Sequence, residues 1–107
     1  MEVTDASTDV YLKILECVDS ALGKLGESVK ESIYYHLKRD FMLGKSKIPR
    51  EPEVFEKALT SIFGKEGYKV IEKMILTEIR KKFQVENGLN LIEAVKVLEN
   101  PKPLKMH

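Results

Sequence analysis

The chain has 107 residues, of which 43% are hydrophobic and 33% are charged, and it contains no Trp. This length allows one domain with one modest core and excludes a multidomain machine. Eighteen basic against seventeen acidic side chains leave a net charge of +1, so the whole chain lacks a field that could hold nucleic acid or anionic lipid. Any such binding has to be local.

Cysteine usage and hydropathy indicate where the protein works. Cys17 is the only cysteine, so neither an intrachain disulfide nor a Cys-rich zinc site can form. No apolar run approaches the ~20 residues of a membrane span, and the acidic start lacks the features of a secretory signal. We expect a cytoplasmic protein without a cofactor, folded as one helical domain with a core over about 8–99 and loose tails at 1–7 and 101–107.

Helical periodicity dominates the first half of the chain. Apolar residues recur at three- and four-residue steps from Thr8 to Leu25, which predicts a helix with one buried face. Ser28 and Glu31 have the spacing of a capping box, so a second helix is expected to follow and to pack against the first as an antiparallel hairpin. The two buried stripes are expected to be Val10, Ile14, Cys17, Val18, Ala21, Leu22 and Leu25, and Val29, Ile33, Leu37 and Phe41.

Two more helices are expected after a loop over 42–52. Pro52 suits the first position of a helix, and Gly64 should end it. The buried side of this helix is expected to be Val54, Phe55, Ala58, Leu59, Ile62 and Phe63. The turn from Gly64 to Gly67 then leads into a helix over 68–83, which is apolar around much of its circumference and should be the central one.

The apolar residues of the helix over 68–83 cover two arcs. One arc carries Val70, Ile71, Met74 and Ile75, and the other carries Leu76, Ile79 and Phe83. The second arc needs a cover, either the C-terminal segment or a second protomer, so we expect Leu76, Ile79 and Phe83 to form an interaction surface for a protein partner or in a homodimer. A polar flank exposed along the whole helix would instead favour a protein that reads a nucleic-acid groove.

The C-terminal segment allows two interpretations. Asn90 and Glu93 can cap a helix that carries Leu91, Ala94, Val95 and Leu98. Alternatively, Asn87-Gly88 lies between alternating apolar residues over 83–91, which is a hairpin signal and would give a small two-stranded ribbon. We favour the helix. The predicted fold class is therefore all-α, a compact bundle of four main helices plus a short C-terminal helix.

The sequence offers little catalytic chemistry. His36 lies one position from the apolar stripe and is interpreted as a boundary residue of its helix, and His107 is the last residue. No pair of His, Cys or carboxylate side chains has the spacing of a metal motif, and Cys17 faces the core. We expect neither an enzyme nor a metal protein.

Positive charge is concentrated in one segment. Residues 32–50 carry five basic side chains against Asp40, whereas residues 1–31 carry seven acidic against three basic ones. The five are Lys38, Arg39, Lys45, Lys47 and Arg50, and a second basic group is Arg80, Lys81 and Lys82. Together they could contact an anion or nucleic acid. If 83–91 is a ribbon, a winged-helix transcriptional regulator is the alternative function.

The chain also resembles a known family. Runs from Ile14 to Leu37, among them Ile33-Tyr34-Tyr35-His36-Leu37, and later Ile48-Pro49 and Ile62-Phe63-Gly64 are similar to archaeal signal-transduction modules called Nitrosopumilus output domains. The resemblance spans about residues 10–83. It implies a small helical module in signalling or regulation and supplies no catalytic residue. We therefore expect a non-enzymatic regulatory or protein-interaction module.

Overall fold

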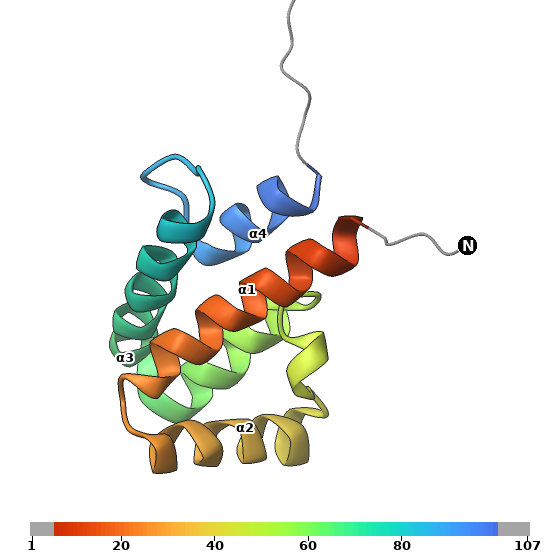
Figure 1. Ribbon diagram of the computed structural model, residues 1–107. Helices are drawn as coiled ribbons and strands as arrows, with labels where there is room; N and C mark the ends of the chain where they lie inside the picture. The colour runs from red at the N-terminus through yellow and green to blue at the C-terminus, as the bar shows by residue number, and fades with distance from the viewer. Residues whose placement is uncertain (1–5, 101–107) are drawn as a thin grey trace, which may run out of the picture.

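A computed structural model describes residues 6–100, with side chains from Asp9 onward. These residues form four α-helices and one 3₁₀ turn, and they contain no strand, which confirms the all-helical fold class. The elements are α1 (Ala6–Gly23), α2 (Glu27–Phe41), η1 (Lys45–Lys47), α3 (Pro52–Lys82) and α4 (Leu91–Glu99) (Figure 1). Within the described part of the chain, no helix has both the length and the hydropathy of a membrane span. Most of the two predicted tails, 1–5 and 101–107, lies outside the described residues, although α1 begins at Ala6.

The central element is α1. Its predicted stripe is buried from Ile14 to Leu22, with Val10 and Leu25 half-buried. This helix contacts α2, α3, α4 and η1, and it contacts α3 most extensively (Figure 1). The expectation that the helix over 68–83 lies centrally is therefore wrong, because that helix keeps one side open to solvent.

Helix α2 packs on α1 as the sequence predicts, but its start differs. Gly26, with a φ of 111°, is the N-cap and makes no side-chain cap hydrogen bond. The predicted capping box is absent because Ser28 already lies inside the first turn. The following segment is a turn with its own buried residues, since Leu43 and Ile48 join the core on either side of η1.

Helix α3 runs across the expected break. Gly64 has φ 83° and ψ 169°, which kinks the helix, and the second half resumes at Lys65 without a loop. The kink turns Ile62 and Phe63 outward, so both are exposed although the sequence predicts them on the buried side. Phe55, Ala58 and Leu59 are buried as expected.

The C-terminal segment is a helix and not a ribbon. Asn90 Oδ1 accepts a hydrogen bond from the Glu93 backbone N–H at 2.8 Å, and the Asn90 backbone N–H donates to Glu93 Oε1 at 2.9 Å. This capping box starts α4, whose buried residues pack on α3 and α1. The Leu91 backbone N–H also donates to Glu72 Oε2 of α3 at 2.9 Å. Residues 83–90 form no strand, so the ribbon needed for a winged helix is absent.

Candidate interaction surface

The prediction of an interaction surface on the second half of α3 is wrong. Ile79 is fully buried within the single chain, Leu76 is 8% exposed and Phe83 is half-buried. The physical reason is the position of α4, which packs on α3 and adds its own apolar residues to the same core. The C-terminal segment, rather than a second protomer, therefore takes the place beside these side chains.

The structure brings together most of the first basic group. Lys38, Arg39 and Lys45 line one hollow of about 650 Å³ between α2 and the segment that contains η1. Lys45 also lines a second hollow of about 570 Å³ against α1, and Arg50 lines a third of about 120 Å³. Lys47 is exposed on η1 but lines none of the three.

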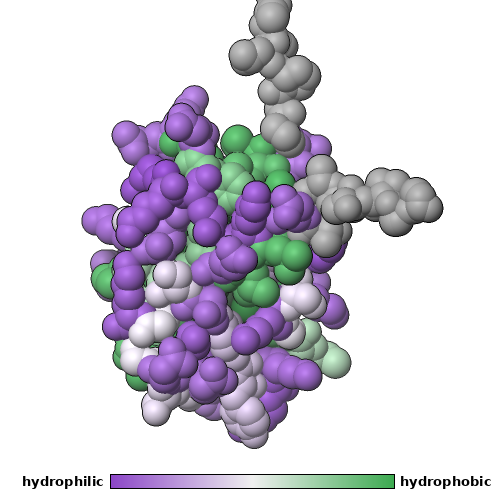
Figure 2. Space-filling view, in the orientation of Figure 1, coloured by the Kyte–Doolittle hydropathy of each residue, from purple (hydrophilic) through white to green (hydrophobic). Residues whose placement is uncertain are grey.

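The three hollows adjoin one another. The first and second share Lys45, the first and third share Ser46, and the second and third share Leu12 and Leu15. We call the surface that they form the η1 face. Its largest exposed apolar side chains are Tyr35 at 60% and Leu12 at 55%. Figure 2 shows hydrophobic side chains gathered between α1 and the segment that contains η1, with hydrophilic ones around them.

Each of three cations on the η1 face lies over a tyrosine ring. Lys45 Nζ is 4.6 Å from the centre of the Tyr34 ring, and the Arg50 guanidinium carbon is 4.3 Å from that of Tyr11. The third pair, Arg39 over Tyr35, is at 5.2 Å. Cation–π contacts hold a cation in position while leaving its N–H donors free for another ligand. The face therefore presents oriented charges on an aromatic base.

A hydrogen bond to Asp19 holds the Tyr34 ring in place. The Tyr34 hydroxyl donates to Asp19 Oδ1 at 2.8 Å, and Lys30 Nζ lies 3.3 Å from the other carboxylate oxygen. Burial, together with the hydrogen bond to Asp19, raises the pKa of Tyr34, so the ring stays neutral. Burial alone would raise the pKa of Asp19, but the hydrogen bonds from Tyr34 and Lys30 outweigh it and lower that pKa.

The η1 face has an excess of positive charge, although the charge of Lys45 is partly offset by Asp19, whose pKa it helps to lower. Among the described residues, Lys38, Lys45 and Arg50 have no carboxylate within ion-pair distance. Two of the three carboxylates that line the hollows are engaged, since Asp19 holds Lys30 and Glu16 Oε1 lies 3.3 Å from Lys82 Nζ. Arg39 is already paired with Asp40 at 2.8 Å.

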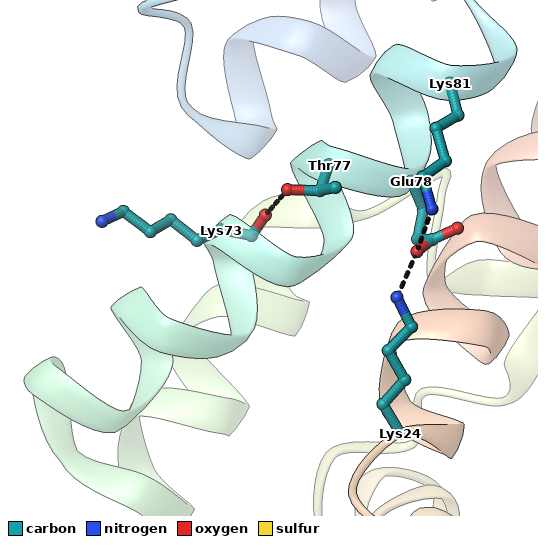
Figure 3. A network of polar contacts seen from close by, with 5 residues as sticks. All are labelled: Lys24, Lys73, Thr77, Glu78 and Lys81. Carbon is teal, nitrogen blue, oxygen red and sulfur yellow. Dashed lines mark hydrogen bonds and ion pairs between the residues drawn. The ribbon is translucent and has the colours of Figure 1, made fainter.

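The second basic group lies elsewhere. Lys82 pairs with Glu16, and Lys81 Nζ turns back to Glu78, which also accepts from Lys24 at 2.6 Å (Figure 3). Figure 1 shows η1 and the second half of α3 on opposite sides of the molecule. Only Lys82 approaches the first basic group, through Glu16, which lines the second hollow; Lys81 is held by Glu78 instead.

The residues with catalytic potential lie apart from one another. His36 Nδ1 is 3.4 Å from Asp40 Oδ2 on the exposed side of α2, at the edge of the apolar stripe. Burial raises the pKa of the Cys17 thiol to about 11, which keeps it protonated at neutral pH. No group of three or more potential metal ligands occurs between residues 6 and 100.

Sequence reasoning missed the apolar half of the η1 face. Leu12 and Leu15 fall outside the predicted stripe of the first helix, and Tyr11 carried no motif. Two leucines off the buried stripe were the available signal, because a large apolar residue on the solvent side of a helix often serves contact with another surface.

No protein-family model, curated protein or solved structure matches the chain.

Proposed function

We propose that this chain is a non-enzymatic protein-interaction module with a regulatory role, and that the η1 face binds its partner. The observation that carries the proposal is the combination, on one hollowed surface, of exposed Leu12 and Tyr35 with cations seated on tyrosine rings. Tyr and Arg are the residue types most enriched at the energetic centres of protein interfaces. The resemblance of residues 10–83 to signalling output domains supports the regulatory role.

The chemistry of the face selects a partner segment that is both apolar and acidic. Exposed Leu12 and half-buried Leu15 offer apolar contact in the second hollow, which is large enough for several side chains. Lys38 and Lys45 at the rim have no carboxylate partner in the described part of the chain, so they would attract carboxylates of the incoming segment. A helix or strand with Leu-like residues beside Asp or Glu fits this pattern.

A site-specific photo-crosslinker tests the proposal. A crosslinking amino acid placed at Tyr35 should trap a partner in a lysate of the native cell, whereas the same amino acid at Val97, which is also exposed but lies on α4, should not. The trapped species should then be lost when Leu12→Ser and Lys45→Glu are introduced together, because both the apolar and the electrostatic contacts are removed.

The matched control is a variant that changes the same residue types away from the face. Val97→Ser with Lys69→Glu should keep the crosslink, since neither residue lines any of the three hollows of the η1 face. Circular dichroism should show that both variants remain folded. Trapping from Val97 with equal efficiency, or a crosslink insensitive to the Leu12 and Lys45 changes, would contradict the proposal. A crosslinked dimer of this chain would identify the occupant as a second copy.

A further inference from the structure

The second half of α3 carries a row of exposed cations beside the strip that α4 covers, where Leu76 is buried. Lys65, Lys69, Lys73 and Arg80 are all exposed, and at 100° per residue they fall within an arc of about 80° on the helix. We call these four residues the α3 flank. Thr77, Val70 and the acidic Glu66, all exposed, lie next to them on the same side, so four cations stand there against one carboxylate.

The cations of the α3 flank are not used by the fold. Among residues 6–100, none of the four has a carboxylate within 4.0 Å. The neighbouring cations differ, because Lys81 is held by Glu78 and Lys82 by Glu16. Figure 3 shows the contrast, with Lys73 extending away from the protein while Lys81 and Lys24 converge on Glu78.

The arrangement fits a linear polyanion. Lys65 and Arg80 are fifteen residues apart, so the flank spans roughly 22 Å along a straight rod of about 10–12 Å diameter. The major groove of duplex DNA is about 12 Å wide and is bordered by phosphates on both sides. A helix lying in or across that groove would place its cations near the phosphates, and the uncharged Thr77 and Val70 near the base edges.

We propose that the α3 flank binds the phosphates of duplex nucleic acid, as a second surface independent of the η1 face. The alternative phosphate source is a membrane surface, but one exposed valine is little apolar area for insertion between headgroups. The four cations also lie in a line along one helix and not in a disc. The duplex is therefore the partner that charge and shape favour.

Salt dependence of binding tests the proposal directly. Fluorescence anisotropy with a labelled duplex of about 20 base pairs should give a slope of log K against log salt of about −3.6, which is the value for four neutralised phosphates. Affinity should then fall by about 150-fold between 50 and 200 mM salt. Lys69→Gln alone should reduce the slope by about 0.9.

Two quadruple variants of equal net charge separate the flank from charge in general. Changing Lys65, Lys69, Lys73 and Arg80 to Gln should abolish binding. Changing Lys38, Lys45, Lys47 and Arg50 to Gln should keep the slope and change affinity less than about tenfold, since these residues lie on the opposite side. Equal loss in both variants, or no binding of the duplex even at low salt, would overturn the proposal. Binding to phosphatidylserine vesicles but not to the duplex would do the same.

Discussion

The η1 face and the α3 flank carry similar numbers of cations but organise them differently. On the η1 face, Lys45 and Arg50 lie over tyrosine rings at the rim of hollows. On the α3 flank, Lys65, Lys69 and Lys73 are exposed and form neither a cation–π contact nor an ion pair within the described chain. A positioned charge in a hollow discriminates between partners at short range. A row of exposed charges attracts a partner at long range, and salt screens that attraction.

The comparison shows why net charge was a poor guide to function. The whole chain is almost neutral, yet both surfaces are locally positive because several nearby carboxylates form ion pairs with cations outside the two surfaces. Glu78 and Glu16 hold the cations next to the flank, and Asp19 supports the base of the η1 face. The following predictions test whether the two surfaces differ as described.

The largest effect is expected on the covered side of α3. Ile79→Ala should cost about 2–5 kcal/mol of unfolding free energy, because Ile79 is fully buried and truncation leaves a cavity. Lys73→Ala on the flank should change stability by less than about 0.5 kcal/mol. Urea denaturation of both variants measures this difference, and similar small effects would mean that Ile79 is not in the core.

A pair of glycines provides the next test, one at each surface. Gly64 precedes the flank with a φ of 83°, and an added Cβ would meet no other atom, so Gly64→Ala should cost about 1–3 kcal/mol from backbone strain alone. Gly44 borders the η1 face with a φ of −70° and equally open surroundings, so Gly44→Ala should be neutral or stabilising by up to about 1 kcal/mol. Equal costs would show that Gly64 is not strained. Thermal or urea unfolding reports both.

The contribution of the hydrogen bond between Tyr34 and Asp19 to stability should depend on pH. Tyr34→Phe removes the hydrogen bond to Asp19 and should cost about 1 kcal/mol at pH 7. Although burial opposes it, the pKa of Asp19 is lowered in the folded protein, so its contribution is present above about pH 3.9, its unfolded pKa, and is lost as the pH falls through the folded value.

The measurement for Tyr34 is urea unfolding between pH 7 and pH 3. The loss of unfolding free energy in Tyr34→Phe relative to the unaltered protein should shrink as the pH falls below about 4. Protonated Asp19 is stabilised less than the carboxylate by a hydrogen bond from the Tyr34 hydroxyl. In an Asp19→Asn background the same tyrosine change should show no such dependence. A deficit that grows toward low pH would contradict the assignment.

The smallest effect is expected for Lys45, the cation that lies over the Tyr34 ring. Lys45→Met keeps the length of the side chain but removes the contact with the Tyr34 ring, and should cost about 0.5–1 kcal/mol. Lys69→Met on the flank should cost nothing measurable, since Lys69 has no recorded partner in residues 6–100. Equal free energies of unfolding for the two variants would show that a cation over a tyrosine ring contributes no more to stability than an exposed one.

Local signals in the sequence were sufficient for most of the secondary structure. The stripe from Ile14 to Leu22 predicted the buried face of α1, Pro52 began α3, and the spacing of Asn90 and Glu93 capped α4. These features involve residues within a few turns of one another, so their physics can be read from spacing alone. The Gly64 break was also predicted, although the helix resumes sooner than expected.

Tertiary packing decided which side of each helix is a surface. Leu76 and Ile79 were interior because α4 packs on α3, and the flank at Lys69 stayed open because no element covers it in the described chain. Arg50 and Tyr11 meet although 39 positions separate them. The sequence by itself determined the helices and the number of basic side chains. Contacts between distant segments determined which of those side chains form ion pairs or ring contacts. These contacts depend on how the helices are oriented and not on residue spacing.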